Sequence, residues 1–396
     1  MDTKNKIQFE LDYIKYLGIL LMVFVHTAET YGATENGIGF FFARVVTNFG
    51  AAQAFMISMG ITLHYSRKQT PYDFMVTGIY LLFLNFFLNI FRFFLPAAYA
   101  YYATGDPACY ADMTTIISND IFAFAGLAML LLAAFKHLNV KPVYIFVVSV
   151  LMSIIGSFLP LADYPSFALT SFVGYFVPAT SDTVFPVMNW FIFPAFGYLL
   201  GEYYVKITDK PAFMKRIAVF CIPLAIVWGL LRYYEILPFK LAITEFASYY
   251  FVNTIDAFMN ITVVMAALSF FYFLAQLIGT PAFIRYGSKH FSKYYAVSWS
   301  LIYVIFRIRQ VNGTDELEGE AALWLTVLFT FVATALLVRI YVSFIDGYVT
   351  SLPATVRWGL LIVVVVASVS TYAETSKYIT VFPTWHNEFH GMAKLG

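Results

Sequence analysis

The feature that most constrains this chain is a succession of eleven apolar runs, each about as long as a membrane-crossing helix. They fall at residues 11–32, 43–64, 73–95, 117–135, 143–161, 184–204, 217–236, 250–278, 294–311, 320–344 and 354–372. A helix needs about 20 apolar residues to cross the hydrocarbon core of a bilayer. The sequence therefore predicts an all-α polytopic protein with about 11 transmembrane helices, embedded in a lipid bilayer.

Composition excludes a soluble domain. Of the 396 residues, 61% are hydrophobic and 12% are charged, whereas soluble domains have roughly 45–50% apolar and 25% charged residues. A large core does not explain the difference, because the buried fraction grows slowly with chain length. The net charge of +1 also gives no basis for nucleic-acid binding, which needs clustered basic residues.

The charges of the connectors predict an orientation. The connectors between runs two and three, four and five, six and seven, and eight and nine are basic, and they carry Arg67, Lys68, Lys136, Lys141, Lys206, Lys210, Lys215, Arg216, Arg285, Lys289 and Lys293. The other connectors carry Asp106, Asp112, Asp163, Asp182, Asp315, Glu316, Glu318 and Glu320. Lysine and arginine mark the cytoplasmic side. We therefore expect residues 1–10 inside the cell and the tail 373–396 outside, on one membrane-embedded domain spanning 1–396.

Several other motif classes are not found in the sequence. Cys109 and Cys221 form neither a CxxC motif nor a disulfide framework. His386 and His390 lie four residues apart but have no third ligand at matching spacing, so we predict no metal site. The polar N-terminus leads into the first apolar run without an A-x-A cleavage signal, which favours a retained first helix.

Among the ionisable residues within or near the ends of the apolar runs, six stand out: His26, Glu29, Arg92, Asp120, Arg232 and Asp256. Such groups are costly at membrane depth and are functional candidates by default. Structural roles fit the same residues. Arg92 and Arg232 are also expected to reach the interface or to form ion pairs. Asp256 is also expected to join a helix-packing network with Asn253 and Asn260.

The first apolar run carries a more specific pattern. Lys15 and His26 are eleven residues apart, so on a helix they share one face and lie ~16 Å apart along the axis. Glu29 follows His26 by about one turn and is close enough to orient or polarise the imidazole. One face of this helix therefore presents a cation near the predicted cytoplasmic side and an imidazole deeper in the membrane.

Residues 11–26, LDYIKYLGILLMVFVH, resemble the opening helix of the transmembrane acyltransferases. These include the acyltransferase-3 family and the heparan-α-glucosaminide N-acetyltransferase-like family. In both, two residues separate an Asp from a basic residue, and ten further residues separate the basic residue from a His. The basic residue is normally Arg. Lys15 keeps its charge here but lacks the forked donor geometry.

Four further segments agree with the resemblance. They are FMISMGITLHYSRK (55–68), NDIFAFAGLAMLLLAAFKHL (119–138), FPVMNWFIFPAFGYLLG (185–201) and GSKHFSKYYAVSWSLIYVIF (287–306). In the last segment Ser298 occupies a position at which relatives often have His. The segments 119–138 and 185–201 are more similar to the heparan-type family than to the acyltransferase-3 family.

The resemblance implies transfer of an acyl group, most simply acetyl, from cytoplasmic acetyl-CoA to an extracytoplasmic sugar or glycan. His26 would be a general base for the acceptor or would carry the acyl group covalently. Glu29 would stabilise the imidazolium. Asp120 would position the acceptor, although a helix-packing or capping role fits it equally well.

The basic residues at the predicted cytoplasmic face are candidates for binding the donor. Lys15, Arg67 and Lys68 would neutralise the phosphates of CoA. Arg67 and Lys68 are also typical of any cytoplasmic loop. They are therefore either contacts for the nucleotide of CoA or ordinary loop residues.

Two alternatives stay open at this point. A transporter or flippase of a polar or lipid-linked substrate would use the same ionisable residues as a pathway, although the sequence has no internal repeat strong enough to support that architecture. A non-catalytic descendant of an acyltransferase is compatible with Lys15 and Ser298. We expect a bacterial cytoplasmic membrane as the location, and a homodimer is compatible with the sequence.

Overall fold

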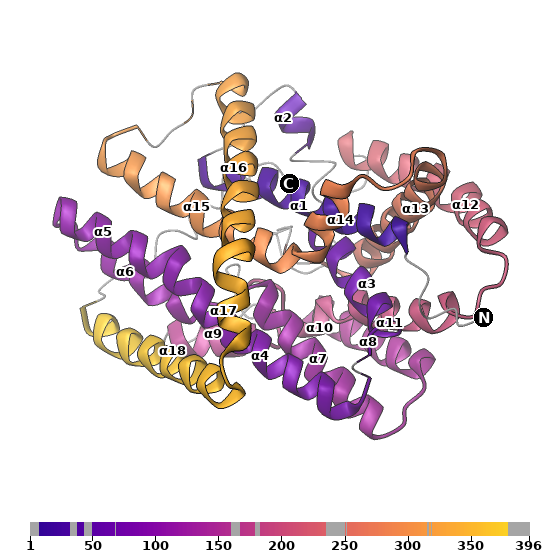
Figure 1. Cartoon of the computed structure of the whole chain (residues 1–396), viewed down its shortest axis with the longest axis horizontal. Coiled ribbons are helices and arrows are strands. Elements are labelled where there is room, and N and C mark those ends of the chain that lie inside the picture. Colours follow the sequence, from indigo (N-terminus) through magenta and orange to yellow (C-terminus); the bar gives the residue numbers. More distant parts are fainter. Residues whose placement is uncertain are drawn as a thin grey trace.

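The protein is all-helical over the residues that its computed structural model describes, which confirms the predicted fold class (Figure 1). These are residues 8–31, 38–42, 50–67, 69–159, 167–178, 183–234, 250, 252–314, 317 and 319–378. Residues outside these ranges include Lys68, Asp163, Asp182, Asp315, Glu316, Glu318, His386 and His390, so the predictions that concern them stay predictions.

Every one of the eleven predicted apolar runs contains a helix. In chain order the elements are α1 (Phe9–Tyr31), α2 (Ile38–Phe41), α3 (Ala51–Leu63), α4 (Pro71–Asn89), the π-helical turn η3 (Ile90–Phe94), α5 (Leu95–Thr104), α6 (Ala108–Thr114), the 3₁₀ turn η4 (Thr115–Ile117), α7 (Ile121–His137), α8 (Pro142–Phe158), α9 (Phe167–Gly174), α10 (Val187–Trp190), α11 (Ile192–Tyr204), α12 (Lys210–Tyr233), α13 (Thr254–Ile278), α14 (Ala282–Lys289), α15 (Phe291–Val311), α16 (Glu320–Ile340), η5 (Tyr341–Ile345), α17 (Asp346–Ser351), α18 (Ala354–Thr375) and η6 (Ser376–Tyr378).

Within the described chain, seven helical segments are long and apolar enough to cross a membrane. They are Phe9–Tyr31, Pro71–Thr104, Ala108–His137, Lys210–Leu231, Thr254–Ile278, Glu320–Ser351 and Ala354–Thr375. The helices α3 and α8 are apolar but shorter. The chain is therefore an integral membrane protein, while the total of eleven crossings and the orientation of the ends stay predictions.

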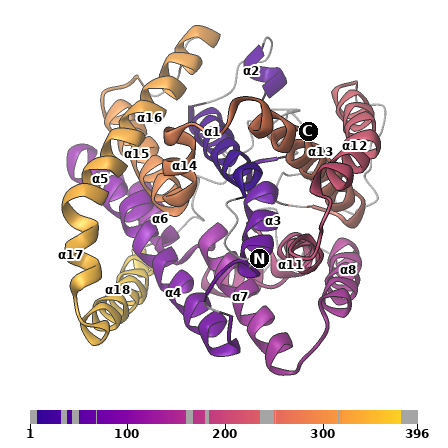
Figure 2. The ribbon, with the colours of Figure 1, turned by 45° about the vertical axis from the view of Figure 1, so that its right-hand side comes forward.

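Helix α1 lies at the centre of the bundle. It packs against α3, α13, α14, α15 and α16, and 72% of its most apolar stretch is buried, compared with 6% in α12 and in α18. Both views place α12 and α18 at opposite edges of the molecule (Figure 1 and Figure 2). The first helix is therefore enclosed by protein on most sides, which is where a site shielded from lipid can form.

Close backbone contacts hold α3 against α11. A Cβ atom on Gly60 would lie 2.4 Å from the carbonyl oxygen of Pro194, and one on Gly197 would lie 2.2 Å from that of Ile57. Small residues at membrane helix interfaces allow such close approach. The segments 55–68 and 185–201, which carry part of the family resemblance, thus pack directly on each other.

The placement of Asp112 corrects one sequence-based prediction. It was predicted to lie in a connector, but it lies in α6 and is buried. Arg307 of α15 pairs with it, with 2.5 Å between Nη2 and Oδ2. An ionised carboxylate is tolerated inside a helical bundle when a cation neutralises it, and the sequence pattern did not reveal this partner.

Candidate active site

His26 lies on α1 facing the aromatic residues of α15. Its imidazole stacks on the indole of Trp299, with 3.5 Å between ring centroids and 10° between planes. The ring of Tyr295 lies at 73° to the same imidazole, with 5.7 Å between ring centroids. His26 is 7% exposed, and its Nδ1 makes no hydrogen bond with any residue that the structure describes. A buried imidazole with an unused ring nitrogen is available for proton transfer.

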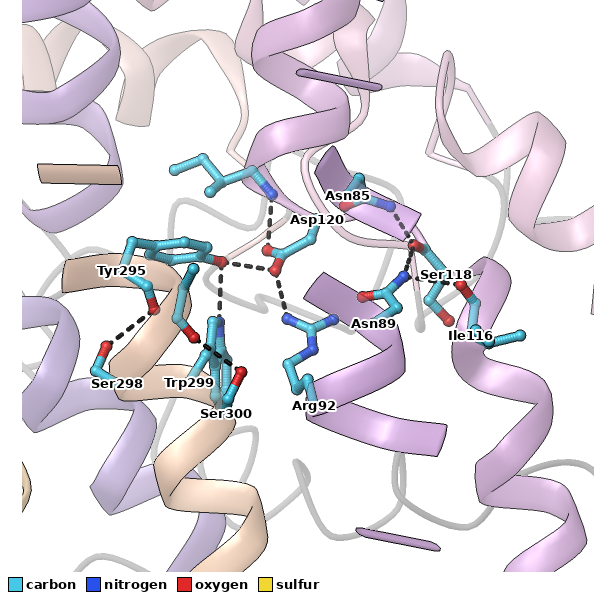
Figure 3. Close-up of polar contacts among 12 residues, drawn as sticks. Asn85, Asn89, Arg92, Ile116, Ser118, Asp120, Tyr295, Ser298, Trp299 and Ser300 are labelled. Atoms are coloured by element: carbon cyan, nitrogen blue, oxygen red, sulfur yellow. Dashed lines mark hydrogen bonds and ion pairs between the residues drawn. The ribbon is translucent and has the colours of Figure 1, made fainter. Parts of the chain in front are cut away.

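Asp120 is the centre of a polar cluster (Figure 3) that includes Tyr295 and Trp299, the two residues whose rings contact His26. Its Oδ1 accepts a hydrogen bond from the backbone N–H of Ile121 at 2.7 Å, which caps α7. Its Oδ2 accepts one from the Tyr295 hydroxyl at 2.6 Å and forms an ion pair with Arg92. Trp299 donates its indole N–H to the Tyr295 oxygen at 2.9 Å. One carboxylate thus connects η3, α7 and α15 beside His26.

A break in the helical backbone places Asp120 where it is. Residues 118–120 are not helical and lie between η4 and α7. Asn85 donates its amide to the carbonyl oxygen of Ser118 at 2.9 Å, and Asn89 donates to the same oxygen at 2.8 Å (Figure 3). Irregular backbone at membrane depth is tolerated only where protein or a cavity satisfies its polar groups. The two asparagines of α4 supply these partners.

Arg92 reaches Asp120 because α4 packs closely against α7 and the helix then continues after α4 as a π-helical turn. A Cβ atom on Gly78 or on Gly126 would lie 2.7 Å from the other glycine's carbonyl oxygen. Arg92 lies in the π-helical turn η3, and such turns occur frequently at functional sites. Its guanidinium carbon lies 4.0 Å from the centroid of the Phe93 ring. Its Nε is buried without a hydrogen bond to any described residue.

Glu29 completes the cluster on α1. It is 6% exposed, and its Oε2 has no hydrogen-bond partner among the described residues. A side-chain hydrogen bond links its carboxyl to Tyr250, and Arg92 and Asp120 are both near enough to act on it electrostatically. The structure therefore brings the three predicted catalytic residues (His26, Glu29 and Asp120) into one buried cluster.

Lys15 lies on α1 toward its N-terminal end. Among the described residues it forms no ion pair within 4.0 Å and no hydrogen bond, although Asp12 is one turn away. Asp12 itself accepts a hydrogen bond from Ser288 of α14 at 2.6 Å. A half-buried cation without a direct partner is suited to bind an anionic group.

Arg67 follows the C-terminal end of α3 and is exposed. That end lies at the same end of the molecule as the beginning of α1, since two contacts connect the elements there. His64 bonds through its Nε2 to the carbonyl oxygen of Tyr198 at 2.8 Å, and Tyr204 on the same helix as Tyr198 donates to Glu10 at 2.5 Å. Arg67 and Lys15 are thus at one end of the bundle, but no contact joins them.

Some alternatives given above for single residues are confirmed. Arg92 forms an ion pair, as its structural interpretation predicted. Asp120 caps α7, as its structural alternative predicted. Asn253 donates its amide to the Asp256 carboxylate at 2.8 Å at the start of α13, whereas the helix-packing network with Asn260 stays a prediction. Ser298 donates to the backbone oxygen of Tyr295 at 3.0 Å, so no buried hydroxyl is left unpaired where relatives often carry histidine.

The sequence did not single out Tyr295, Trp299 or Arg307. The first two lie in the segment 287–306, so the resemblance marked the right stretch but only the structure shows which side chains face His26. Arg307 lies near the end of an apolar run and looks like an interfacial residue in the sequence, whereas it forms the second buried ion pair.

The comparison with known families decides the class of this protein. The model of the family described as heparan-alpha-glucosaminide N-acetyltransferase, catalytic, matches residues 8–234. The chain belongs to this family. Among curated proteins no significant match was found. The matched residues contain α1, η3 and the break before α7, hence His26, Arg92 and Asp120, whereas Tyr295 and Trp299 lie beyond them.

Membership in the heparan-alpha-glucosaminide N-acetyltransferase family makes this chain a membrane acetyltransferase at the family level. It favours the acyltransferase interpretation over the transporter. The residues that match the family also contain the two close helix contacts described above, α3 with α11 and α4 with α7. These contacts bring the ionisable residues of separate helices together.

Proposed function

We propose that this protein transfers an acetyl group from cytoplasmic acetyl-CoA to a hydroxyl or amino group of a sugar or glycan on the opposite side of the membrane. The observation that carries the proposal is the buried His26, whose Nδ1 has no hydrogen-bond partner in the described part of the chain, near the ion pair of Arg92 and Asp120. Buried titratable groups with unsatisfied polar atoms are typical of active sites.

The donor would enter along α1. Lys15 supplies a cation for the phosphates of CoA, and the helical rise between Lys15 and His26 amounts to ~16 Å. The slender pantetheine arm can follow this helix and present the thioester carbonyl to the imidazole. Arg67, at the same end of the bundle, adds a second positive charge near that entrance, and Lys68 is proposed for the same role. This orientation requires a cytoplasmic N-terminus, as the basic connectors predict.

The proposed reaction transfers one proton, from the acceptor to His26 and then to the leaving CoA thiolate. His26 takes the proton from the acceptor O–H or N–H, the acceptor oxygen or nitrogen forms a bond to the thioester carbonyl carbon, and the carbon–sulfur bond breaks. The imidazolium then returns its proton to the departing CoA thiolate. Glu29 stabilises the positive imidazolium. In the covalent variant the imidazole first takes the acetyl group itself and then passes it to the acceptor.

Arg92 is the group best suited to the negative charge that develops on the carbonyl oxygen. It is a buried cation, its Nη1 contacts Asp120, and its Nε makes no hydrogen bond among the described residues. Fixed donors in a water-excluded site stabilise an oxyanion strongly. We propose that Arg92 directs its remaining N–H groups at this oxygen, while Asp120 holds the guanidinium and positions the acceptor nearby.

The test is acetyl-CoA consumption by the purified protein in detergent, with His26→Ala as the variant. A general base contributes about 10²–10⁴-fold, so we expect a loss of at least that lower value. His137→Ala, on an exposed histidine at the end of α7, is the matched control and keeps its activity. Equal rates for wild type and His26→Ala would reject the acetyl-transfer mechanism and return the transporter to consideration.

A further inference from the structure

The way His26 is held differs from the usual arrangement of a working histidine. An imidazole in a catalytic or metal site is normally oriented by a hydrogen bond at its second ring nitrogen, donated to a carboxylate or a backbone carbonyl. The Nδ1 atom of His26 is buried and makes no such bond with any residue in the described part of the chain. Its ring plane is instead parallel to the indole of Trp299, at 3.5 Å and 10°.

Trp299 is itself held in place. Its indole N–H donates to the Tyr295 hydroxyl at 2.9 Å, and that hydroxyl donates to Asp120 at 2.6 Å. Asp120 is anchored by the ion pair with Arg92 and by the N–H of Ile121 at 2.7 Å. Hydrogen bonds in a buried network of low dielectric are stronger than in water and restrict the side chains that they join. The indole therefore has a fixed plane against which the imidazole rests.

We propose that Trp299 is the positioning residue of His26, and that Asp120 acts on the imidazole through Tyr295 and Trp299 rather than through a direct hydrogen bond. The proposal rests on the acetyl transfer argued above. Stacking orients the ring without a hydrogen bond at Nδ1, so this nitrogen stays available to take a proton from the acceptor and to return it to the leaving thiolate. The indole face also stabilises the imidazolium, because aromatic faces attract cations.

Two substitutions at one position test the stacking. Trp299→Leu removes the flat surface, and we expect kcat to fall by about 10²-fold, the cost of a misplaced reacting group. Trp299→Phe keeps an aromatic face and restores most of that loss. KM for acetyl-CoA stays unchanged in both, since Lys15 lies ~16 Å away along α1. This split between kcat and KM, with rescue by Phe, is not expected of a residue that merely fills space.

Phe291 offers a matched control on the same helix. It stacks on Phe55 with 4.1 Å between centroids and 8° between planes, so Phe291→Leu deletes a comparable stacked ring away from His26. We expect a similar drop in unfolding temperature but an unchanged kcat. Equal kcat losses in Phe291→Leu and Trp299→Leu would overturn the proposal, because the effect would then be general to the packing of α15.

A conservative variant keeps the test decisive if Trp299→Leu does not fold. Tyr295→Phe deletes the hydroxyl that connects Trp299 to Asp120 and changes little else. We expect about a tenfold lower kcat, roughly the worth of one hydrogen bond in the network. Full activity of this variant would overturn the connection to Asp120. Full activity of Trp299→Leu beside an inactive His26→Ala would reject only the positioning role, whereas an active His26→Ala rejects acetyl transfer itself.

Discussion

Replacing Arg92 separates the stability of the buried ion pair from its part in the reaction. Both side chains of the pair are 4% exposed, so water cannot take the place of a missing partner. Arg92→Met leaves a charged Asp120 buried beside hydrocarbon, and breaking such a pair costs about 3–5 kcal/mol. Tyr295 and the Ile121 N–H still bond to the carboxylate. We therefore expect the free energy of unfolding to fall by about 3 kcal/mol, the lower end of that range.

The double variant Arg92→Met with Asp120→Asn is the informative one. No buried charge is left, and asparagine still caps α7, so we expect most of the lost stability to return. Activity does not return, because the proposed oxyanion donor is missing, and such donors contribute about 10²–10³-fold to kcat. Stability is measured by unfolding in denaturing detergent, and activity by acetyl-CoA consumption per folded protein at saturating donor.

The second buried ion pair provides the control. Arg307 and Asp112 are 8% and 9% exposed, with 2.5 Å between Nη2 and Oδ2. Arg307→Met should destabilise the protein and Asp112→Asn should again restore stability, with kcat changing by no more than about threefold throughout. If the double variant at Arg92 and Asp120 regains wild-type activity together with stability, the pair is structural and the oxyanion assignment is refuted.

Three further outcomes test other parts of the structure. Gly197→Ala places a methyl group 2.2 Å from the oxygen of Ile57 and should lower the free energy of unfolding by about 1–3 kcal/mol. Gly359→Ala meets nothing within 4 Å and lies inside α18, so it should keep or slightly raise the unfolding temperature; equal losses in both variants would contradict the close contact. Lys15→Gln should raise KM for acetyl-CoA at least about tenfold, with Lys15→Arg close to wild type, and an unchanged KM would remove it from the donor site. His64 bonds through its Nε2 to the carbonyl oxygen of Tyr198 at 2.8 Å, so His64→Phe should lower the free energy of unfolding by about 0.5–1.5 kcal/mol, the net contribution of one hydrogen bond. An unchanged unfolding temperature would contradict this contact.

Much of the helical architecture follows from the chain alone. An apolar run in lipid has to satisfy its own backbone hydrogen bonds, so it forms a helix whatever its neighbours are, and each of the eleven runs contains one. The spacing of Lys15 and His26 is equally local, since both lie on one uninterrupted helix. The sequence did not predict where the backbone departs from a regular α-helix, as in the π-helical turn around Arg92 and the non-helical residues 118–120 before α7.

The partners of the buried polar groups were decided by tertiary structure. Asp120 bonds to Tyr295, 175 residues away, and pairs with Arg92, 28 residues before it. Nothing in the spacing of these residues predicts this, because a buried charge is neutralised by whichever polar group helix packing brings within reach. That packing depends on close contacts such as Gly78 with Gly126. Local sequence therefore determined which residues lie at membrane depth, and the arrangement of helices determined which of them meet, because helix formation is local whereas ion pairing is not.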